Sequence, residues 1–337
     1  MSIASAGSPR FKAMWVVIAI TSVVVAQAMP EAQLPMDHPI AVVPDAPAFL
    51  AAAQANLLRA QQAAHQFSYQ ERRTRFRTNP LGKLGPDGTE LYQVYPSANP
   101  QLTYRRLLER DGIPVSDLAK RDREHQARTA EVLRRRDKQS DDDRRQKAED
   151  EGLARRRAQA MIDDIVAALQ FTVSGRTIYD GDPAITVAFV GNRAFRPATR
   201  EGRIAQKLEG TVWIHSGLNE VMHVEAKAID EISFGFGIVA RINKGTAGWL
   251  TRRPIGTGLK PDLWMPTNLR LSGSGRAMLF LRTLRIEYVA DWFDYRRLTA
   301  DTPWGHLNAK CVALSAAGRA DTRRDDQVAA GARSGAK

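Results

Sequence analysis

The apolar residues of this chain repeat with two different periods, and the period changes near residue 67. Between residues 45 and 66 they recur about every 3.6 positions, which is the spacing of one face of an α-helix. Asp45 stands where an N-cap belongs, and Pro47 falls in the first turn, where proline is tolerated. The predicted packing face of this helix consists of Phe49, Leu50, Ala53, Leu57, Ala60 and Ala64.

From residue 67 onward the dominant period is two, which is typical of β-strands. About ten or eleven strands are predicted, and the fold class is mainly β (α+β). Their expected ranges are 67–74, 90–95, 102–108, 171–178, 184–190, 207–215, 220–229, 231–242, 247–254, 263–271 and 276–289. Because no helical pattern separates the strands after residue 170, we expect an antiparallel meander, built as a sandwich or as a strongly curved sheet.

A highly charged segment interrupts the strands between residues 105 and 157, where we count about 17 basic and about 13 acidic residues. Good helix formers dominate it, so we expect a long charged helical insertion at about residues 109–169, as one exposed helix or a helical pair. Apolar residues return at helical spacing after residue 153, which predicts that the end of the insertion docks on the body. The alternative is an arm that binds a partner or a membrane surface.

Residues 212–225 predict a hairpin with apolar residues on both faces. A turn centred on Gly217 and Leu218 would pair His215 with Glu220 and Trp213 with Met222. One face would carry Trp213, His215, Glu220, Met222 and Val224, and the other Val212, Ile214, Val221, His223 and Glu225. Two covered faces imply a second apolar surface, which is either another sheet or an internal cavity.

The strand predicted at residues 276–289 shows the same two-sided apolar pattern. Such strands in a curved sheet suit a cavity for acyl chains, although a plain β-sandwich core would show them too. The residues that we expect to line a ligand cavity are Trp213, Met222, Trp264, Met278, Phe280 and Ile286.

The N-terminal residues have the pattern of an export signal. Arg10 and Lys12 precede an apolar run at residues 13–25, and Ala-Gln-Ala at residues 26–28 is a cleavage site of the A-x-A type. Residues 1–28 are therefore predicted to be a cleavable signal peptide and the protein to be periplasmic. An uncleaved inner-membrane anchor is the alternative. Residues 29–44 are expected to be extended, and residues 298–337 to form a disordered tail.

The amino-acid composition limits the kinds of ligand and partner that the protein is expected to bind. The net charge of +12 and the pI of about 10.1 favour polyanions, and export makes nucleic acid the least suitable among them. The single cysteine, Cys311, excludes an internal disulfide. We expect a monomer whose ligands are lipid or lipoprotein acyl chains, with an envelope membrane protein as a further possible partner.

The sequence contains no motif of a known catalytic or metal site. It lacks H-E-x-x-H, C-x-x-C and G-x-S-x-G, and the hairpin register above puts His215 and His223 on opposite faces. The sequence therefore predicts no enzyme, no cofactor and no metal. Residues 246–261 could form a mobile loop at a cavity mouth, or a plain hairpin loop.

Three segments, taken in order, resemble a known family. Residues 210–215 (Gly-Thr-Val-Trp-Ile-His) and 220–225 (Glu-Val-Met-His-Val-Glu) resemble the G-x-x-W-I-D hairpin of LolA-like outer-membrane lipoprotein-sorting proteins, with His215 in place of the usual Asp. Residues 262–266 resemble the W-L-P strand of that family, and residues 291–297 its closing aromatic strand. The resemblance implies a half-open β-barrel within a single domain at residues 45–297. Helices would close its concave side, over an apolar cavity for acyl chains.

The sequence thus predicts a periplasmic protein that binds lipid or lipoprotein acyl chains without catalysis, in outer-membrane lipid or lipoprotein trafficking. The alternative is a cell-envelope sensor or scaffold that binds a partner or an anionic membrane through its charged helical segment.

Overall fold

The computed structural model describes seven stretches of the chain: 46–78, 84–97, 102–137, 141–234, 240–256, 263–276 and 283–299. The predicted signal peptide, the extended segment at 29–44 and nearly all of the predicted tail lie outside the described residues. So do two residues expected to line the cavity, Met278 and Phe280.

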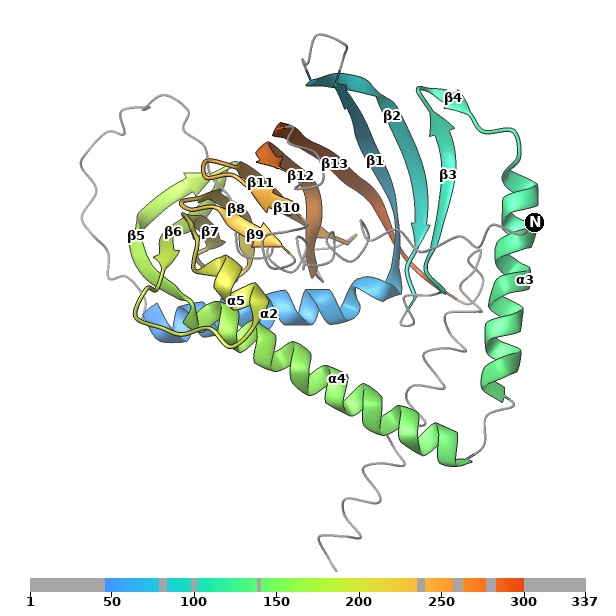
Figure 1. The fold of residues 1–337 in the computed structure, drawn as a ribbon, viewed down its shortest axis with the longest axis horizontal. Helices are drawn as coiled ribbons and strands as arrows, with labels where there is room; N and C mark the ends of the chain where they lie inside the picture. The colour runs from blue at the N-terminus through green and yellow to red at the C-terminus, as the bar shows by residue number, and fades with distance from the viewer. Residues whose placement is uncertain are drawn as a thin grey trace, which may run out of the picture. The chain divides into compact units, whose positions relative to one another are not determined.

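Thirteen strands form one antiparallel sheet (Figure 1), which confirms the mainly β prediction. The strands are β1 (Phe67–Thr78), β2 (Leu84–Tyr95), β3 (Tyr104–Arg110), β4 (Ile113–Pro114), β5 (Leu169–Tyr179), β6 (Asp182–Gly191), β7 (Leu208–His215), β8 (Val221–Ala228), β9 (Ile232–Phe234), β10 (Ala240–Ile242), β11 (Ala247–Ile255), β12 (Leu263–Arg276) and β13 (Thr283–Arg297). Their order is β4-β3-β2-β1-β13-β12-β11-β8-β7-β6-β5, with β10 pairing β12 and β9. The described strands end at β4 and β5 and therefore do not close into a barrel.

Several predicted strand boundaries differ from the observed ones, and in two places the prediction of a single strand was wrong. The strand expected at 231–242 is a hairpin, because β9 and β10 pair with each other through Phe234 and Ala240. The strand expected to begin at 276 begins at Thr283, while β12 continues to Arg276. In both places the sequence stays apolar beyond the end of the strand. The hydrophobic pattern therefore did not show where one strand ends and the next begins.

The chain divides into two compact units. Unit 1 contains residues 1–62, 72–89 and 157–292, and unit 2 contains residues 63–71, 90–156 and 293–337.

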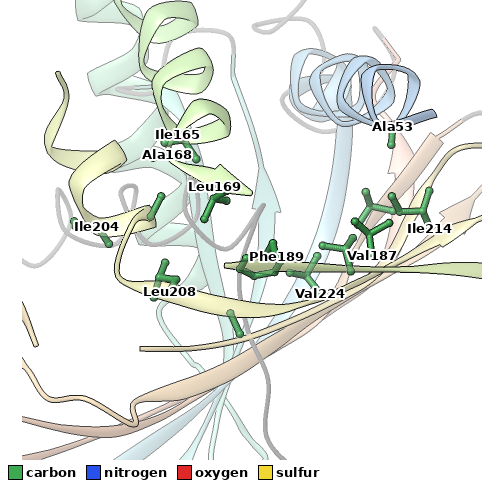
Figure 2. Close-up of a cluster of buried hydrophobic side chains, with 14 of the residues drawn as sticks. Ala53, Ile165, Ala168, Leu169, Val187, Phe189, Ile204, Leu208, Ile214 and Val224 are labelled. Atoms are coloured by element: carbon green, nitrogen blue, oxygen red, sulfur yellow. The ribbon is translucent and has the colours of Figure 1, made fainter. Parts of the chain in front are cut away.

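The core of unit 1 lies on one face of β5 to β8 (Figure 2). Helix α2 (Ala46–Ala63), which continues into the 3-10 helix η1 (Ala64–Gln66), confirms the predicted helix and places Phe49 and Ala53 on this face. The last turns of α4 (Asp141–Ala167) add Ile165. The strands supply buried branched and aromatic residues, among them Ile185, Val187, Phe189, Val212, Ile214, Val221 and Val224. Burial of each such side chain stabilises the fold by roughly 1.5–3 kcal/mol.

The short helix α5 (Arg200–Ala205) was not predicted, because it has too few residues for a periodic pattern. Its N-cap is Thr199, whose hydroxyl accepts a hydrogen bond from the Gly202 amide at 2.9 Å. Asp164 of α4 accepts hydrogen bonds from the amides of Ala198 and Thr199 at 2.9 and 2.8 Å. Burial alone would raise the pKa of Asp164, but the hydrogen bonds from Thr199 and the backbone lower it.

In unit 2, helix α3 (Leu118–Asp137) contacts β3. Asp122 of α3 accepts hydrogen bonds from the Tyr104 hydroxyl at 2.7 Å and from two nitrogens of Arg106 at 2.9 and 2.7 Å. His125 stacks on the Tyr104 ring at 4.1 Å, and burial lowers the pKa of this histidine. The charged sequence forms two helices, α3 and α4, which agrees with the helical pair among the expected forms. A long charged insertion that stands apart from the sheet is not evident, because specific contacts hold α3 against β3.

Candidate functional site

The β7–β8 hairpin has a β-bulge that the sequence prediction missed. Trp213 pairs with His223 and Ile214 with Val221, so Met222 is the extra residue between them. The predicted pairing of Trp213 with Met222 was wrong, although the backbone amide of His215 does donate to the Glu220 carbonyl at 2.8 Å. Trp213 and Met222 share a face as predicted. Beyond the bulge the predicted faces are exchanged: the ring of His223 lies 5.2 Å from that of Trp213, and Val224 lies in the core with Val212.

Three of the residues predicted to line a cavity lie together. Trp213 of β7, Met222 of β8 and Trp264 of β12 pack with Ala184 and Tyr179 in one apolar cluster, here called the Trp264 cluster. Val212 and Ile214, which flank Trp213 in β7, point instead into the core beneath α2. Since successive side chains of a strand alternate between faces, the cluster lies on the face opposite α2.

The Trp264 cluster is closely packed and contains one polar group without a partner. Met222 is 0% exposed and Trp264 is 2% exposed. The indole N–H of Trp264 makes no hydrogen bond to any described residue. A buried indole N–H normally has an acceptor, so its position marks a place where an oxygen atom would be stabilised.

The other predicted lining residues are not brought to the cluster by the described part of the chain. Ile286 lies on β13, is half-buried and pairs with Gly273 of β12. Met278 and Phe280 are outside the described residues, so their place in a cavity stays a prediction.

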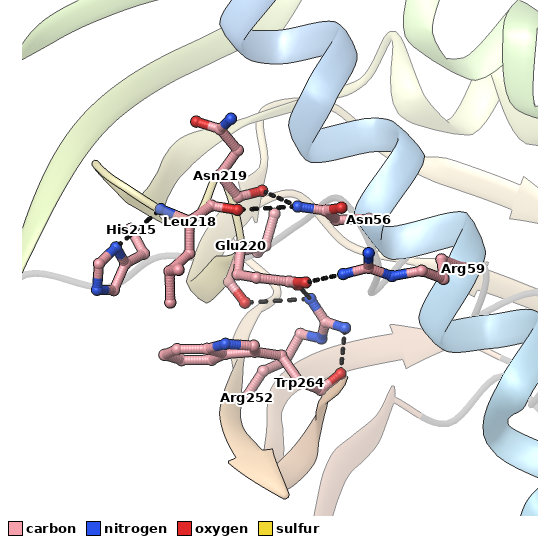
Figure 3. A network of polar contacts seen from close by, with 9 residues as sticks. Asn56, Arg59, His215, Leu218, Asn219, Glu220, Arg252 and Trp264 are labelled. Atoms are coloured by element: carbon pink, nitrogen blue, oxygen red, sulfur yellow. Dashed lines mark hydrogen bonds and ion pairs between the residues drawn. The ribbon is translucent and has the colours of Figure 1, made fainter. Parts of the chain in front are cut away.

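A buried ion pair stands beside the cluster at the β7–β8 turn (Figure 3). Glu220 and Arg252 are each 3% exposed, and their side chains approach to 3.7 Å. Arg252 also donates to the backbone carbonyls of Val221, at 3.1 Å, and of Trp264. Burial raises the pKa of Glu220, although the guanidinium groups of Arg252 and Arg59 oppose the shift. This arginine therefore joins the turn to the strand that carries Trp264.

Helix α2 is attached to the same turn. Arg59 donates to Glu220 at 2.9 Å, and the Asn56 amide donates to the carbonyls of Leu218 and Asn219 at 3.0 Å each (Figure 3). His215 accepts hydrogen bonds from the amides of Gly217 and Leu218 at 3.1 and 3.2 Å. His215 thus closes the turn through its ring nitrogen, as the side-chain oxygen of an aspartate does in an Asx turn.

Sequence reasoning also missed the surroundings of His223. Its ring contacts Thr251 at 3.0 Å through Nδ1 and Glu225 at 3.0 Å through Nε2, and it stacks on Tyr179 at 5.0 Å. These contacts depend on the cross-strand pairing of Thr251 with His223. The sequence alone does not reveal which strands are neighbours, so the contacts could not be predicted from it. Both ring nitrogens have partners, so a structural role accounts for this histidine.

Within the described ranges, no group of three His, Cys, Asp or Glu side chains is placed to hold a metal ion. Within the same ranges, no helix has both the length and the apolar character required to cross a membrane.

Comparisons with known proteins give only distant structural likenesses. A DUF1329 family protein from Desulfovibrio piger aligns over 77% of this chain and 96% of its own, with 12% identity and a TM-score of 0.26. An outer-membrane lipoprotein-sorting protein domain from Vibrio parahaemolyticus aligns over 79% and 98%, with 9% identity and a TM-score of 0.30. MucB in complex with MucA(peri) aligns over 72% and 94%, with 10% identity and a TM-score of 0.18. No family model and no curated protein matches the chain. Because these TM-scores are low, the function has to be argued from the residues of this chain.

Proposed function

We propose that this protein binds the apolar chain of a lipid or of an acylated lipoprotein in the periplasm, without catalysis, and that it serves outer-membrane lipid or lipoprotein trafficking. The observation that carries the proposal is the Trp264 cluster, in which apolar side chains from five strands pack together and the indole N–H of Trp264 has no described partner. The predicted export signal is the reason for placing this function in the periplasm.

The chemistry of the cluster suits a lipid better than a polar ligand. The half-buried members of the cluster, Trp213 and Tyr179, present mainly ring surface, and each ligand methylene group buried against them would stabilise the complex by about 0.8 kcal/mol. Methionine is unbranched and adapts to irregular apolar shapes. The N–H of Trp264 would donate to an ester or carboxyl oxygen at the head of the chain. Met278, Phe280 and Ile286 are proposed as further walls of the same site.

Two single tryptophan substitutions, one in the cluster and one outside it, test the proposal. Trp213→Ala removes a half-buried wall of the cluster and is expected to lower the affinity for a fluorescent fatty acid by about tenfold or more, a loss of several buried methylene contacts. Trp249→Ala is the matched control, because Trp249 is also half-buried but packs against the core of unit 1, with the guanidinium of Arg270 over its ring, outside the Trp264 cluster. Equal losses of affinity in the two variants would contradict the assignment of the site.

The natural ligand is sought by mass spectrometry of organic extracts. The protein is purified without detergent from a periplasmic preparation, and we expect lipid in stoichiometric amount with wild-type protein and much less with Trp213→Ala. A well-folded sample without any lipid would count against the proposal.

A second candidate is an envelope sensor or scaffold. The observation that favours it is the exposed basic face of α3, which carries Lys120, Arg121 and Arg128. Deleting the helix would not test this function cleanly, since α3 holds Tyr104 and Arg106 of β3. Substitutions on the exposed face are needed instead.

A further inference from the structure

In unit 2 a cleft of about 370 Å³ lies between α3 and β3. Its lining consists of Tyr104, Arg105, Asp117, Lys120, Arg121, Glu124 and Arg128. Ligand sites commonly begin at roughly 300 Å³, so the cleft is large enough for a small charged group. Asp117 directly precedes α3. Lys120 and Arg121 are neighbours on the helix, and Glu124 and Arg128 follow at intervals of three and four residues, so these four form one stripe along α3.

The charges of the cleft do not balance. Four basic and two acidic side chains line it, and Glu71, which pairs with Arg105, adds a third carboxylate, so the excess is one positive charge. Arg105 pairs with the buried Glu71, and Arg121 pairs with Asp117 at 2.8 Å. Lys120 and Arg128 make no ion pair with any described residue, so both cations can donate to a ligand.

The framework around these cations is firmly held. Tyr104 forms one wall, and its ring is fixed by the hydroxyl bond to Asp122 and by the stacked ring of His125. Arg105 is held over the Tyr92 ring at 5.7 Å while it pairs with Glu71. A ligand therefore meets a cleft whose cationic groups come from two elements that already contact each other, and little ordering cost remains for the backbone.

We propose that this cleft binds a phosphate-type anion, with Arg128 and Lys120 as its main donors. Arginine offers several N–H groups in a planar fork that matches phosphate oxygens, and lysine adds a compact charge. The anion could be part of a lipid headgroup or a free phosphate compound, since both present the same oxygen atoms. This site lies in unit 2 and does not depend on the acyl-chain site of unit 1.

The test uses two exposed arginines of the same helix. Arg128 lines the cleft and Arg123 does not, and Arg→Glu at either position changes the net charge by the same amount. Binding of inorganic phosphate to the full mature chain is measured by calorimetry. Binding to vesicles of phosphatidylcholine, with and without phosphatidylglycerol, is measured by flotation. Arg128→Glu is expected to weaken binding by about tenfold, because it removes a charge-assisted hydrogen bond and adds repulsion. Arg123→Glu is expected to change it by less than about twofold, since exposed charges outside the site are screened.

The outcomes separate the two sources of the anion. Loss of both phosphate and phosphatidylglycerol binding in Arg128→Glu supports a headgroup site, and loss of phosphate binding with no vesicle binding supports a free phosphate compound. Equal weakening by the two variants would show general attraction by a basic surface and overturn the proposal. Absence of binding to both probes would overturn it as well, and so would binding of an acidic peptide in their place. Thermal unfolding of both variants, expected to match the wild type, excludes misfolding as the cause.

Discussion

Replacing Arg252 with methionine is expected to destabilise the protein by about 3–5 kcal/mol at neutral pH, the usual cost of removing one partner of a buried ion pair. The substitution leaves the carboxylate of Glu220 buried, and among the described residues the exposed Arg59 remains as its cationic partner. It also leaves two backbone carbonyls, of Val221 and Trp264, without their donor. Equilibrium unfolding in urea, followed by tryptophan fluorescence, measures the change in the free energy of unfolding.

The loss should shrink as the pH falls. Burial already raises the pKa of Glu220 above its ordinary value, and Arg252 is a group that opposes this shift, so its removal raises the pKa further. Between the ordinary and the raised pKa the folded state binds more protons than the unfolded state, so stability decreases as the pH rises through this window. Acidification into the window therefore protonates Glu220 in the folded protein and recovers part of the stability.

The double variant Glu220→Gln with Arg252→Met is the control for this interpretation. Without an ionisable group at position 220, the pH dependence in this window should vanish, and much of the stability at neutral pH should return. A cost below about 1 kcal/mol for Arg252→Met alone would mean that water reaches Glu220 and that the pair is effectively a surface pair.

Hydrophobic periodicity was sufficient to predict most elements of this fold. The two-residue period located nearly every long strand, and the 3.6-residue period located α2, because each of these elements buries one face over many residues. The elements that it missed are short. β4 has 2 residues and α5 has 6, so their positions depend on tertiary contacts such as those of Asp164 with Ala198 and Thr199.

The site was less accessible from sequence than the fold. The prediction named Trp213, Met222 and Trp264, and the structure brings these three together, but on the face away from α2. One extra residue at the bulge adds His223 to that side, since Met222 and His223 then point the same way. No residue type marks a bulge of this kind, so the alternation rule was applied across it. The role of Arg252 was equally hidden, because it depends on the pairing of β11 with its neighbours.

The charged helical segment shows a different limit of prediction from hydrophobicity. Its composition predicted exposure, and most side chains of α3 that are described are exposed. His125 and Thr129, spaced four residues apart, are nevertheless buried against the sheet together with the half-buried Asp122. The face of α3 that packs on the sheet consists of polar residues. It was not predicted, because a buried helix face is recognised in a sequence by its apolar residues.

Gly210→Ala is expected to destabilise the protein by about 3 kcal/mol or more, beyond the middle of the range for overpacked cores. Gly210 lies on β7 between Phe189 of β6 and Ala226 of β8. A β-carbon here would stand 2.7 Å from the Ala226 α-carbon and 2.7 Å from the Phe189 ring, and closer still to the carbonyl oxygen of Glu225. Two of these three obstacles are backbone atoms of a paired strand, which cannot move without breaking the β7–β8 ladder.

Gly217→Ala provides the comparison within the same hairpin. Its β-carbon would meet only the His215 ring, at 3.8 and 3.9 Å, which are ordinary contact distances, so its effect should stay within about 0.5 kcal/mol. Urea unfolding of both variants tests the difference. A Gly210→Ala protein as stable as wild type would show that β7 and β8 can separate locally and that the close approach is not required. The expected result would instead explain the glycine that opens the family-like segment 210–215: the strand needs space at this position for the core ring of Phe189, three residues before Trp213 enters the Trp264 cluster.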